Sequence, residues 1–342
     1  MEGRRIAMDL IERYQGCLLG LAVVDALGTT LEFKPRGTFE PIDDMVGGGC
    51  FDLEPGQWTD DTSMALCLAE SLIEKKGFDP YDQMEKYLLW YRTGYMSSTG
   101  ACFDIGGTTR AALEAFEMTG EPFSGPANPR SSGNGSLMRL APVPMFFFPE
   151  RDAMIFYAGE SSRTTHGSQA CIDACRLFAS ILFNAFSGMD KERVLFDHDP
   201  AIVQSPAIRE VAHGAYRGKT EEQIQGIGYV LKSLETALWC FYTTDSFRDA
   251  VLKAANLCDD ADTTAAICGQ VAGAFYGLPS IAASWRRCLI MHEEIRHMAR
   301  HLFNKNYGSS PSSILLMRAR LSITSDWRTR ASSVRSTILN SC

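Results

Sequence analysis

The chain has 342 residues, of which 45% are hydrophobic and 22% are charged, a composition typical of a globular protein that buries its core without disulfides. The formal net charge of −8 argues against a nucleic-acid partner and against an anionic membrane surface. No segment reaches the roughly 18 uninterrupted apolar residues that indicate a transmembrane helix, so we expect no membrane span.

The N-terminal region predicts an apolar helix over residues 10–28. Asp9 and Glu12 interrupt the apolar core that a signal peptide would need within residues 1–16, so we expect no signal peptide and a cytoplasmic protein. Gly16 and Gly20 are four residues apart and therefore lie on one face of the helix. Such a ridge of small residues lets another helix approach closely.

A second helix is predicted over residues 60–76. Thr59 is a plausible N-cap, and Asp60 and Asp61 would occupy the first turn, where the helix dipole favours acidic side chains. Three further segments follow: helices over residues 80–92 and 105–118, and a Pro- and Gly-rich loop over residues 121–136.

The second half of the chain continues the helical pattern. Predicted helices cover residues 137–147, 150–162, 167–186, 190–196, 206–215, 221–241 and 245–256. A helix over residues 262–277 carries Gly269, Gly273 and Gly277 at a spacing of four. It is too short to cross a membrane, so this ridge predicts close packing against another core helix. Convincing alternating strands are absent, and the sequence predicts an all-α fold.

We expect one domain over residues 1–303 and a poorly ordered, basic tail over residues 304–342. The tail is rich in serine, its periodicity is weak, and it holds six Lys and Arg residues against Asp326 alone. A mobile appendage is the preferred interpretation of such a segment. An unnatural or frameshifted C-terminus is the alternative.

Eleven cysteines are scattered along the chain, without a CxxC pair. Several stand at apolar positions of predicted helices, among them Cys67, Cys171 and Cys175. Their number is odd, which does not suit a complete disulfide framework, and a zinc site is not expected without ligand spacing. We therefore predict buried free thiols in a reducing cytoplasm.

Two short segments concentrate carboxylates and hydroxyl groups at helix starts. The sequence TDDT stands at residues 59–62 and the sequence DDADTT at residues 259–264. Neighbouring carboxylates repel each other, and a helix N-terminus supplies only about half a unit of compensating charge. A divalent cation would supply the rest, and oxygen ligands favour magnesium, manganese or calcium. The alternative, that each cluster only caps its helix, is the weaker interpretation for two matching clusters.

Six motifs carry a more specific resemblance. They are VDALGTTLEF at residues 24–33, WTDDT at 58–62, FDIGGTT at 103–109, GNGSLMR at 133–139, TTH at 164–166 and the acidic cluster at 259–264. In this order they resemble the ADP-ribosylglycohydrolase family, in particular the bacterial branch that includes dinitrogenase reductase-activating glycohydrolase. The resemblance runs from about Gln15 to Tyr276. It implies a compact, orthogonal multi-helix all-α domain with a dinuclear magnesium cleft.

The resemblance also implies which residues hold the metal. The ligands of two Mg²⁺ ions, for which Mn²⁺ could substitute, would be Thr59, Asp60, Asp61, Asp260, Asp262 and Thr263. Asp61 and Asp260 would share in catalysis with Glu32, which matches the glutamate that reaches the reacting ribose. Asp259 would cap its helix or support the ligand shell. Taken alone, Glu32 is more typical of a solvated loop acid.

Further residues are implied as substrate contacts: Asp104, Gly107, Ser132, Gly133, Asn134, Gly135, Ser136 and His166. Asp104 matches an acid that faces the substrate guanidinium in the arginine-directed branch, and a carboxylate can accept two parallel N–H bonds. The loop at 133–136 could bring backbone N–H groups close to a diphosphate, although GNGS alone is usually a turn. His166 matches a histidine near the ribose or phosphate, although a lone histidine is more often structural.

Three positions depart from the family pattern. Val24 stands where glycine usually precedes Asp25, Gly107 stands where the family has asparagine, and Cys258 replaces a glycine before the second acidic cluster. Gly107 removes a side-chain amide near the substrate, while Val24 and Cys258 add bulk where backbones or metal ligands crowd. The metal ligands are intact, so we expect metal binding and leave the level of turnover open.

The expected activity is a magnesium-dependent hydrolysis that removes ADP-ribose from modified protein side chains, above all from ADP-ribosyl-arginine by cleavage of an N-glycosyl bond. The substrate would be an ADP-ribosylated protein and the product ADP-ribose. We expect a monomer without a membrane or nucleic-acid partner. One alternative is another ADP-ribosyl linkage, to serine, in O-acetyl-ADP-ribose or at a nucleic-acid end. Another is a non-catalytic protein that only binds ADP-ribose.

Overall fold

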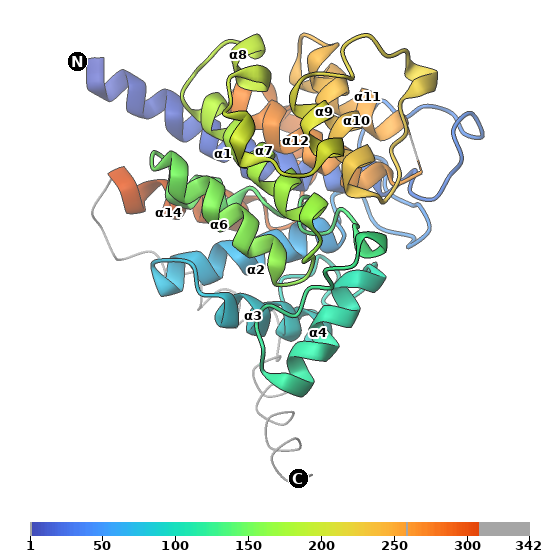
Figure 1. Cartoon of the computed structure of the whole chain (residues 1–342). Helices are drawn as coiled ribbons and strands as arrows, with labels where there is room; N and C mark the ends of the chain where they lie inside the picture. Colours follow the sequence, from blue (N-terminus) through green and yellow to red (C-terminus); the bar gives the residue numbers. More distant parts are fainter. Residues whose placement is uncertain (1, 258, 308–342) are drawn as a thin grey trace.

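The computed structural model describes residues 2–257 and 259–307 (Figure 1). Cys258 and all of the predicted tail beyond residues 304–307 lie outside the described residues. Within them the chain forms helices joined by turns and loops, with two isolated β-bridges, Gly48 to Leu53 and Gly133 to Tyr229. The predicted all-α fold is therefore confirmed. None of the described helices is long and apolar enough to span a membrane.

The helices are joined by turns and by loops, the longest of which covers residues 29–59 between α1 and α2. The α-helices are α1 (Glu2–Gly28), α2 (Asp60–Lys75), α3 (Pro80–Thr93), α4 (Gly107–Thr119), α5 (Pro142–Phe147), α6 (Arg151–Arg163), α7 (Gln169–Phe186), α8 (Lys191–Phe196), α9 (Pro206–Ala212), α10 (Val230–Tyr242), α11 (Phe247–Asn256), α12 (Ala261–Tyr276), α13 (Ala283–Cys288) and α14 (His292–Tyr307). Short 3₁₀ helices are η1 (Pro129–Ser131), η2 (Pro200–Ile202), η3 (Glu221–Gln223) and η4 (Leu278–Ser280).

Two predicted helices differ markedly from the structure. The one predicted over residues 137–147 is reduced to α5, which begins at Pro142 because proline lacks the N–H that an earlier start would require. The one predicted over residues 221–241 begins only with α10. Gly226 lies in the extended stretch before it, and its carbonyl accepts the N–H of Asp260 at 2.8 Å. Helices α13 and α14 were not predicted.

Helices α1 and α12 lie side by side and form the most extensive helix–helix contact of the described residues (Figure 1). The two predicted glycine ridges face each other in this contact. A Cβ atom at Gly20 would lie 2.4 Å from the carbonyl oxygen of Gly269, and one at Gly273 would lie 2.0 Å from that of Gly16. The two backbones therefore touch directly, which leaves no room for side chains at these positions.

The same contact continues to the N-terminus of α12. A Cβ atom at Gly28, the last residue of α1, would lie 2.4 Å from Cα of Asp262. Asp25, one helical turn before Gly28, is thereby brought next to the first turn of α12. Helix α12 also packs against α7, α10 and α11, while α14 packs against α1, α2 and α5. The acidic residues at the ends of α1 and α12 are thus held by the core.

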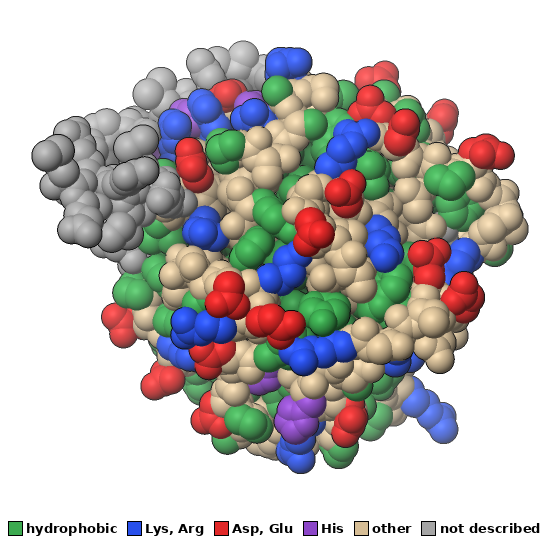
Figure 2. Space-filling view, turned by 90° about the horizontal axis from the view of Figure 1, so that it is seen from above, with side chains coloured by type: hydrophobic (Ala, Val, Ile, Leu, Met, Phe, Trp, Pro, Cys, Tyr) green, Lys and Arg blue, Asp and Glu red, His purple; other side chains and the backbone are tan. Residues whose placement is uncertain are grey.

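Charged side chains of both signs are distributed over the face of the domain that Figure 2 shows. Figure 2 shows Lys and Arg side chains interspersed with Asp and Glu side chains over the described part of one face.

Within the described residues, nine cysteines are free thiols, and the buried ones are Cys17, Cys67, Cys171, Cys175, Cys240 and Cys268. The prediction of buried free thiols is confirmed for these six, while Cys50 is exposed.

We expect Gly273→Ala to lower the free energy of unfolding by about 3 kcal/mol, because a methyl group would force the backbones of α1 and α12 apart. Gly77→Ala is the matched control, since a Cβ atom there meets nothing within 4 Å. Urea unfolding of both variants measures the difference. Equal unfolding midpoints would contradict the view that direct backbone contact holds the two helices together.

Candidate functional site

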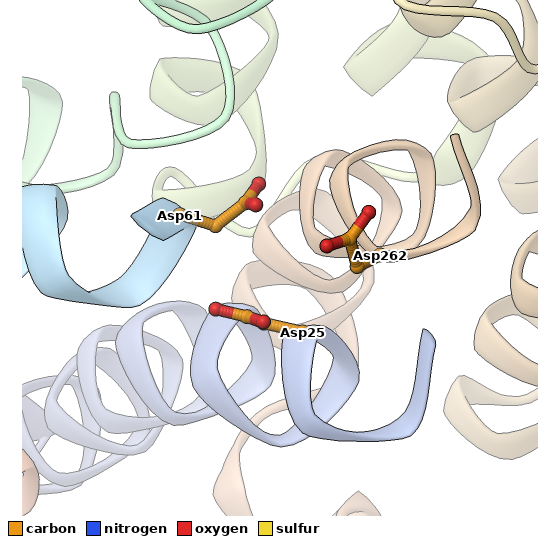
Figure 3. A group of neighbouring side chains, drawn as sticks. All are labelled: Asp25, Asp61 and Asp262. Atoms are coloured by element: carbon orange, nitrogen blue, oxygen red, sulfur yellow. The ribbon is translucent and has the colours of Figure 1, made fainter. Parts of the chain in front are cut away.

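Three buried carboxylates from three helices meet at the N-terminal ends of α2 and α12. Asp25 lies on α1, Asp61 on α2 and Asp262 on α12, and Figure 3 shows their side chains around a common space. One carboxylate oxygen of each lies within 4.8 Å of the other two. All three side chains are almost completely buried. Like charges this close together require compensation.

Asp25 holds the start of α2 from the neighbouring helix. Its Oδ1 accepts hydrogen bonds from the backbone N–H and the hydroxyl of Thr59, both at 2.9 Å. Its Oδ2 accepts from the backbone N–H of Thr62 at 3.0 Å and from the Thr62 hydroxyl at 2.6 Å. Thr59 stands at the predicted N-cap position, but its own side chain makes no cap hydrogen bond. The capping is done by Asp25.

Asp25 is a site residue that the sequence analysis did not assign. It satisfies the free N–H groups at the N-terminus of α2, which otherwise would have no partner. The sequence does contain a signal for it, because Asp25 is the only acid in the apolar run from Cys17 to Leu31. A single acid at a core-facing position has to have a partner elsewhere in the fold.

A cavity of about 270 Å³ opens beside these carboxylates. Its acidic lining residues are Glu32, Asp60, Asp104 and Asp260. Glu32 and Asp104 also approach the buried cluster, because one carboxylate oxygen of each lies within 4.8 Å of a carboxylate oxygen of Asp262. The cavity and the buried cluster are therefore parts of one acidic site.

The six predicted metal ligands all belong to this site. Those that line the cavity are Asp60, Asp260 and Thr263. The other three are buried beside it. The hydroxyl of Thr59 lies 3.2 Å from Oδ2 of Asp262, and the hydroxyl of Thr263 lies 3.3 Å from Oδ2 of Asp61. Side chains of the two acidic segments thus contact each other between α2 and α12.

Burial and mutual repulsion raise the pKa values of these acids. The pKa values of Asp61 and Asp262 lie well above the ordinary value, first because of burial and then because of neighbouring carboxylates. Burial, followed by the charge of Asp104, raises the pKa of Glu32 to about 11. Burial, followed by the charge of Asp260, raises the pKa of Asp104 to about 7.

The residues present fit divalent cations. Oδ1 of Asp61 is buried and has no hydrogen-bond partner among the described residues. The largest charge effects on Asp61 and Asp262 come from other carboxylates rather than from a basic side chain. A cation would compensate these charges, and donors that are all oxygen atoms suit a hard ion such as magnesium or manganese.

The loop at residues 133–135 and His166 form another wall of the cavity. A Cβ atom at Gly135 would lie 2.8 Å from Cε1 of His166, and one at Gly133 would lie 3.3 Å from Nε2. The imidazole therefore packs closely against a backbone without side chains. Asn134 connects this wall to the acids, because its Nδ2 donates to Oδ2 of Asp260 at 2.7 Å.

Two predicted substrate contacts are not among the residues that line the cavity. The hydroxyl of Ser132 donates to the carbonyl of Pro129 at 2.7 Å. The hydroxyl of Ser136 accepts a hydrogen bond from that of Ser162 at 2.9 Å. Both side chains therefore form bonds within the protein that hold the loop at residues 133–135 in place.

The departures from the family pattern lie in different surroundings. Gly107 lines the cavity next to Asp104, and a Cβ atom there would meet nothing within 4 Å. The space of a larger side chain is therefore left open. Val24 is buried where α1 crosses α12, with Cγ2 3.0 Å from the place of a Cβ atom at Gly269. Its bulk is accommodated by the glycine ridge.

Asp259 connects the loop of Glu32 to the start of α12. Its carbonyl accepts the N–H of Phe33 at 2.8 Å, and its own N–H donates to the carbonyl of Lys34 at 3.4 Å. The N-cap position of α12 belongs to Asp260. Asp259 therefore supports the site through its backbone, in a left-handed conformation with φ of 67°, and the cap that was one expectation for it is not formed.

Comparison with known proteins agrees with this geometry. The sequence model of the ADP-ribosylglycohydrolase family matches residues 7–312. The chain belongs to the ADP-ribosylglycohydrolase family. This confirms the resemblance carried by the six motifs, and it agrees with an all-helical domain whose acidic site lies at helix starts and loops.

Individual relatives cover most of the chain. It is 42% identical over 295 residues to the ADP-ribosylarginine hydrolase Tri1 of Pseudomonas putida (strain GB-1), which covers 86% of this chain and 79% of that protein. It is 30% identical over 287 residues to the ADP-ribosyl-dinitrogen reductase glycohydrolase of Rhodospirillum rubrum, with 83% and 92% covered. A solved structure of an ADP-ribosylglycohydrolase-related protein complex matches with a TM-score of 0.78 and 40% identity, covering 87% of this chain and 99% of that one.

In EDTA we expect the folded state to lose stability as the pH rises. Folding raises the pKa of Asp104 from 3.8 to about 7, so the folded protein binds this proton more tightly than the unfolded chain. The resulting stabilisation is complete below the unfolded pKa and is lost as the pH rises through about 7. Mg²⁺ should oppose this loss at neutral pH. Thermal unfolding across this range, with EDTA and with Mg²⁺, measures both effects.

Asp61→Asn is the complementary variant. It replaces a buried carboxyl group that repels its neighbours when ionised with a neutral amide, so we expect its Tm in EDTA to exceed that of the wild type and its gain from Mg²⁺ to shrink. Asp152→Asn is the control, because Asp152 is an exposed acid in the first turn of α6. A wild-type Tm that does not respond to Mg²⁺ or Mn²⁺ would contradict the assignment of a metal site.

Proposed function

We propose that this protein is a magnesium-dependent hydrolase that releases ADP-ribose from modified arginine side chains. The observation that carries the proposal is the meeting of Glu32, Asp104 and Asp262 within 4.8 Å, at a cavity next to a cluster of uncompensated carboxylates. The proposal is supported by relatives that are named ADP-ribosylarginine hydrolases and are 42% identical to this chain.

We infer a centre of two Mg²⁺ ions, for which Mn²⁺ would substitute, held by Thr59, Asp60, Asp61, Asp260, Asp262 and Thr263. When bound, the ions would supply the positive charge that keeps the surrounding carboxylates ionised and would polarise the oxygen atoms they contact. Asp25 has a different role. Its two oxygens already accept four hydrogen bonds from Thr59 and Thr62, so it fixes the frame in which the ligands stand.

Glu32 is the residue to which we assign the reacting end of the substrate. It is 4% exposed, lines the cavity and stands on a loop that Asp259 ties to α12. Once ionised, its carboxylate can take a proton from water or hold a ribose hydroxyl. Asp260 lines the same cavity, and together with Asp61 of the buried cluster it completes the proposed catalytic acids.

Asp104 is the residue to which we assign the arginine. Its carboxylate borders the cavity beside Glu32 and offers two oxygens, which match two parallel N–H groups of a guanidinium. The adjacent Gly106 and Gly107 lack side chains, and Cβ atoms there would meet nothing within 4 Å. This opening gives room for the protein backbone that carries a modified arginine.

The wall at residues 133–135 and His166 would receive the remainder of the ADP-ribosyl group. Backbone N–H groups of a glycine-rich loop can approach phosphate oxygens without obstruction. An ADP-ribosylated protein is then the substrate and ADP-ribose the product. The monomeric state and the cytoplasmic location stay predictions from the sequence.

The proposal is tested by incubating the purified protein and Mg²⁺ with a peptide that carries ADP-ribosyl-arginine, and by following free ADP-ribose by chromatography. We expect release that stops in EDTA. Glu32→Gln should lower kcat about 100-fold or more, because the loss of a general base typically costs that much. Glu40→Gln is the matched control, an exposed acid of the same segment that does not line the cavity.

Two outcomes would contradict the proposal. Tight binding of ADP-ribose without turnover, with metal shown to be bound, would favour a non-catalytic binding protein. Turnover that Glu32→Gln leaves unchanged would remove Glu32 from the reaction.

A second measurement separates arginine from other linkages. We expect Asp104→Ala to lower kcat/KM on an ADP-ribosyl-arginine peptide by about tenfold to a hundredfold, because a charge-assisted pair with the guanidinium is lost. The same variant should change the rate on ADP-ribosyl-serine much less. If the variant lowers kcat/KM equally on both substrates, Asp104 acts on the metal centre or on the ribose rather than on the acceptor side chain.

A further inference from the structure

A buried guanidinium lies directly behind His166. Arg139 is completely buried, and the centre of the Tyr87 ring lies 4.7 Å from its guanidinium carbon. Its Nη1 donates to the carbonyl of Gly135, and its Nη2 donates to the hydroxyl of Thr165 at 2.8 Å. It forms no ion pair with a carboxylate among the described residues. Burying a charge without a counter-ion is unfavourable, so a guanidinium at this position indicates a specific role.

Thr165 connects this guanidinium to the histidine. Its hydroxyl oxygen lies 2.8 Å from Nη2 of Arg139 and 2.9 Å from Nδ1 of His166. A guanidinium has donors only, so the Thr165 oxygen is the acceptor in the first of these bonds. The Thr165 hydroxyl proton then has one acceptor within reach among the described residues, and that acceptor is Nδ1.

This arrangement decides the tautomer of the imidazole. If Nδ1 accepts a hydrogen bond, a neutral ring carries its proton on Nε2. The reverse assignment would make Nδ1–H the donor and would leave the hydroxyl proton of the fully buried Thr165 without an acceptor, which is unfavourable. Burial, followed by the charge of Arg139, lowers the pKa of His166 to about 3, which agrees with a neutral ring.

Nε2 of His166 lies beside the glycine-rich loop that lines the cavity. His166 lines the cavity, and Cβ atoms at Gly133 and Gly135 would lie 3.3 Å and 3.2 Å from Nε2. Within the part of the chain that the structure describes, Nε2 has no hydrogen-bond partner. An N–H group at this atom is therefore free to donate to a group in the cavity.

We propose that Arg139 is a positioning residue that acts through Thr165 to fix His166 as a neutral Nε2–H donor toward an oxygen of the bound ADP-ribosyl group. The same guanidinium holds the carbonyl of Gly135, so it aligns the loop and the histidine together. The identity of the bound group rests on the proposed function. The tautomer of His166 in the ligand-free protein does not depend on the proposed function.

The ligand-free state is measured by two-bond ¹H–¹⁵N correlation spectra of protein labelled at histidine, with His166→Gln to assign the signals. We expect one tautomer with the proton on Nε2 and no titration across the neutral range. A proton on Nδ1, or an imidazolium at neutral pH, in the wild-type protein would overturn the proposal without any variant.

Arg139→Met tests whether Arg139 determines the tautomer of His166. Without the guanidinium, the Thr165 oxygen no longer accepts from Nη2 and is free to accept from Nδ1–H instead, so we expect both tautomers. The Kd for ADP-ribose, measured by calorimetry with Mg²⁺, should rise about tenfold, the effect of one hydrogen bond to a charged group. Arg139→Lys keeps a cationic donor and should retain most of the wild-type tautomer and affinity.

Arg13→Met is the matched control. Arg13 also donates to backbone carbonyls, those of Ala185, Ala274 and Phe275, but it stands more than three helical turns before Asp25 on α1. We expect it to lower the Tm without changing the His166 signals. If Arg139→Met leaves the tautomer unchanged, or if Arg13→Met alters it equally, Arg139 has only a structural role. If the tautomers behave as expected but wild-type protein does not bind ADP-ribose, the positioning role stands and the proposed function fails.

Discussion

Direct backbone contact between α1 and α12 is the constraint on which the site depends. Glycines at four positions let the two helices approach until carbonyl oxygens occupy the space of Cβ atoms. The contact continues to Gly28 and Asp262, and it therefore sets the distance between acids that are far apart in the sequence. A wider separation would move Asp25 away from Asp262 and from the start of α2 that it caps.

The fold thus holds together charges that repel each other. Asp25 is stabilised by four hydrogen bonds, whereas Oδ1 of Asp61 has none among the described residues, and the pKa values of Asp61 and Asp262 are raised. Buried groups that lower the stability of the fold are typical of functional sites, where binding or catalysis requires them. Arg139, behind His166, is a second example, because it is a buried cation without a carboxylate partner among the described residues.

Much of this arrangement can be predicted from the sequence because its causes are local. The spacing of Gly16 and Gly20, and of Gly269 and Gly273, identified both faces of the helix contact, and the acidic segments identified the two helix starts that meet. The role of Asp25 could not be predicted, because it depends on which helix start lies opposite it. The break before α10 was missed for the same reason, since the carbonyl of Gly226 is used by Asp260 from a distant segment.

The acidic site also sets an order of events during synthesis. The hydroxyl of Thr59 and the carboxylate of Asp262 that meet in it are 203 positions apart, and a ribosome delivers α1 and α2 long before α12. Until then the glycine face of α1 has no partner, and Asp25 and Asp61 lack Asp262, the third member of their cluster. Contacts so distant in sequence form late and slowly. The full set of oxygen donors from α1, α2 and α12 can therefore come together only in a nearly complete domain.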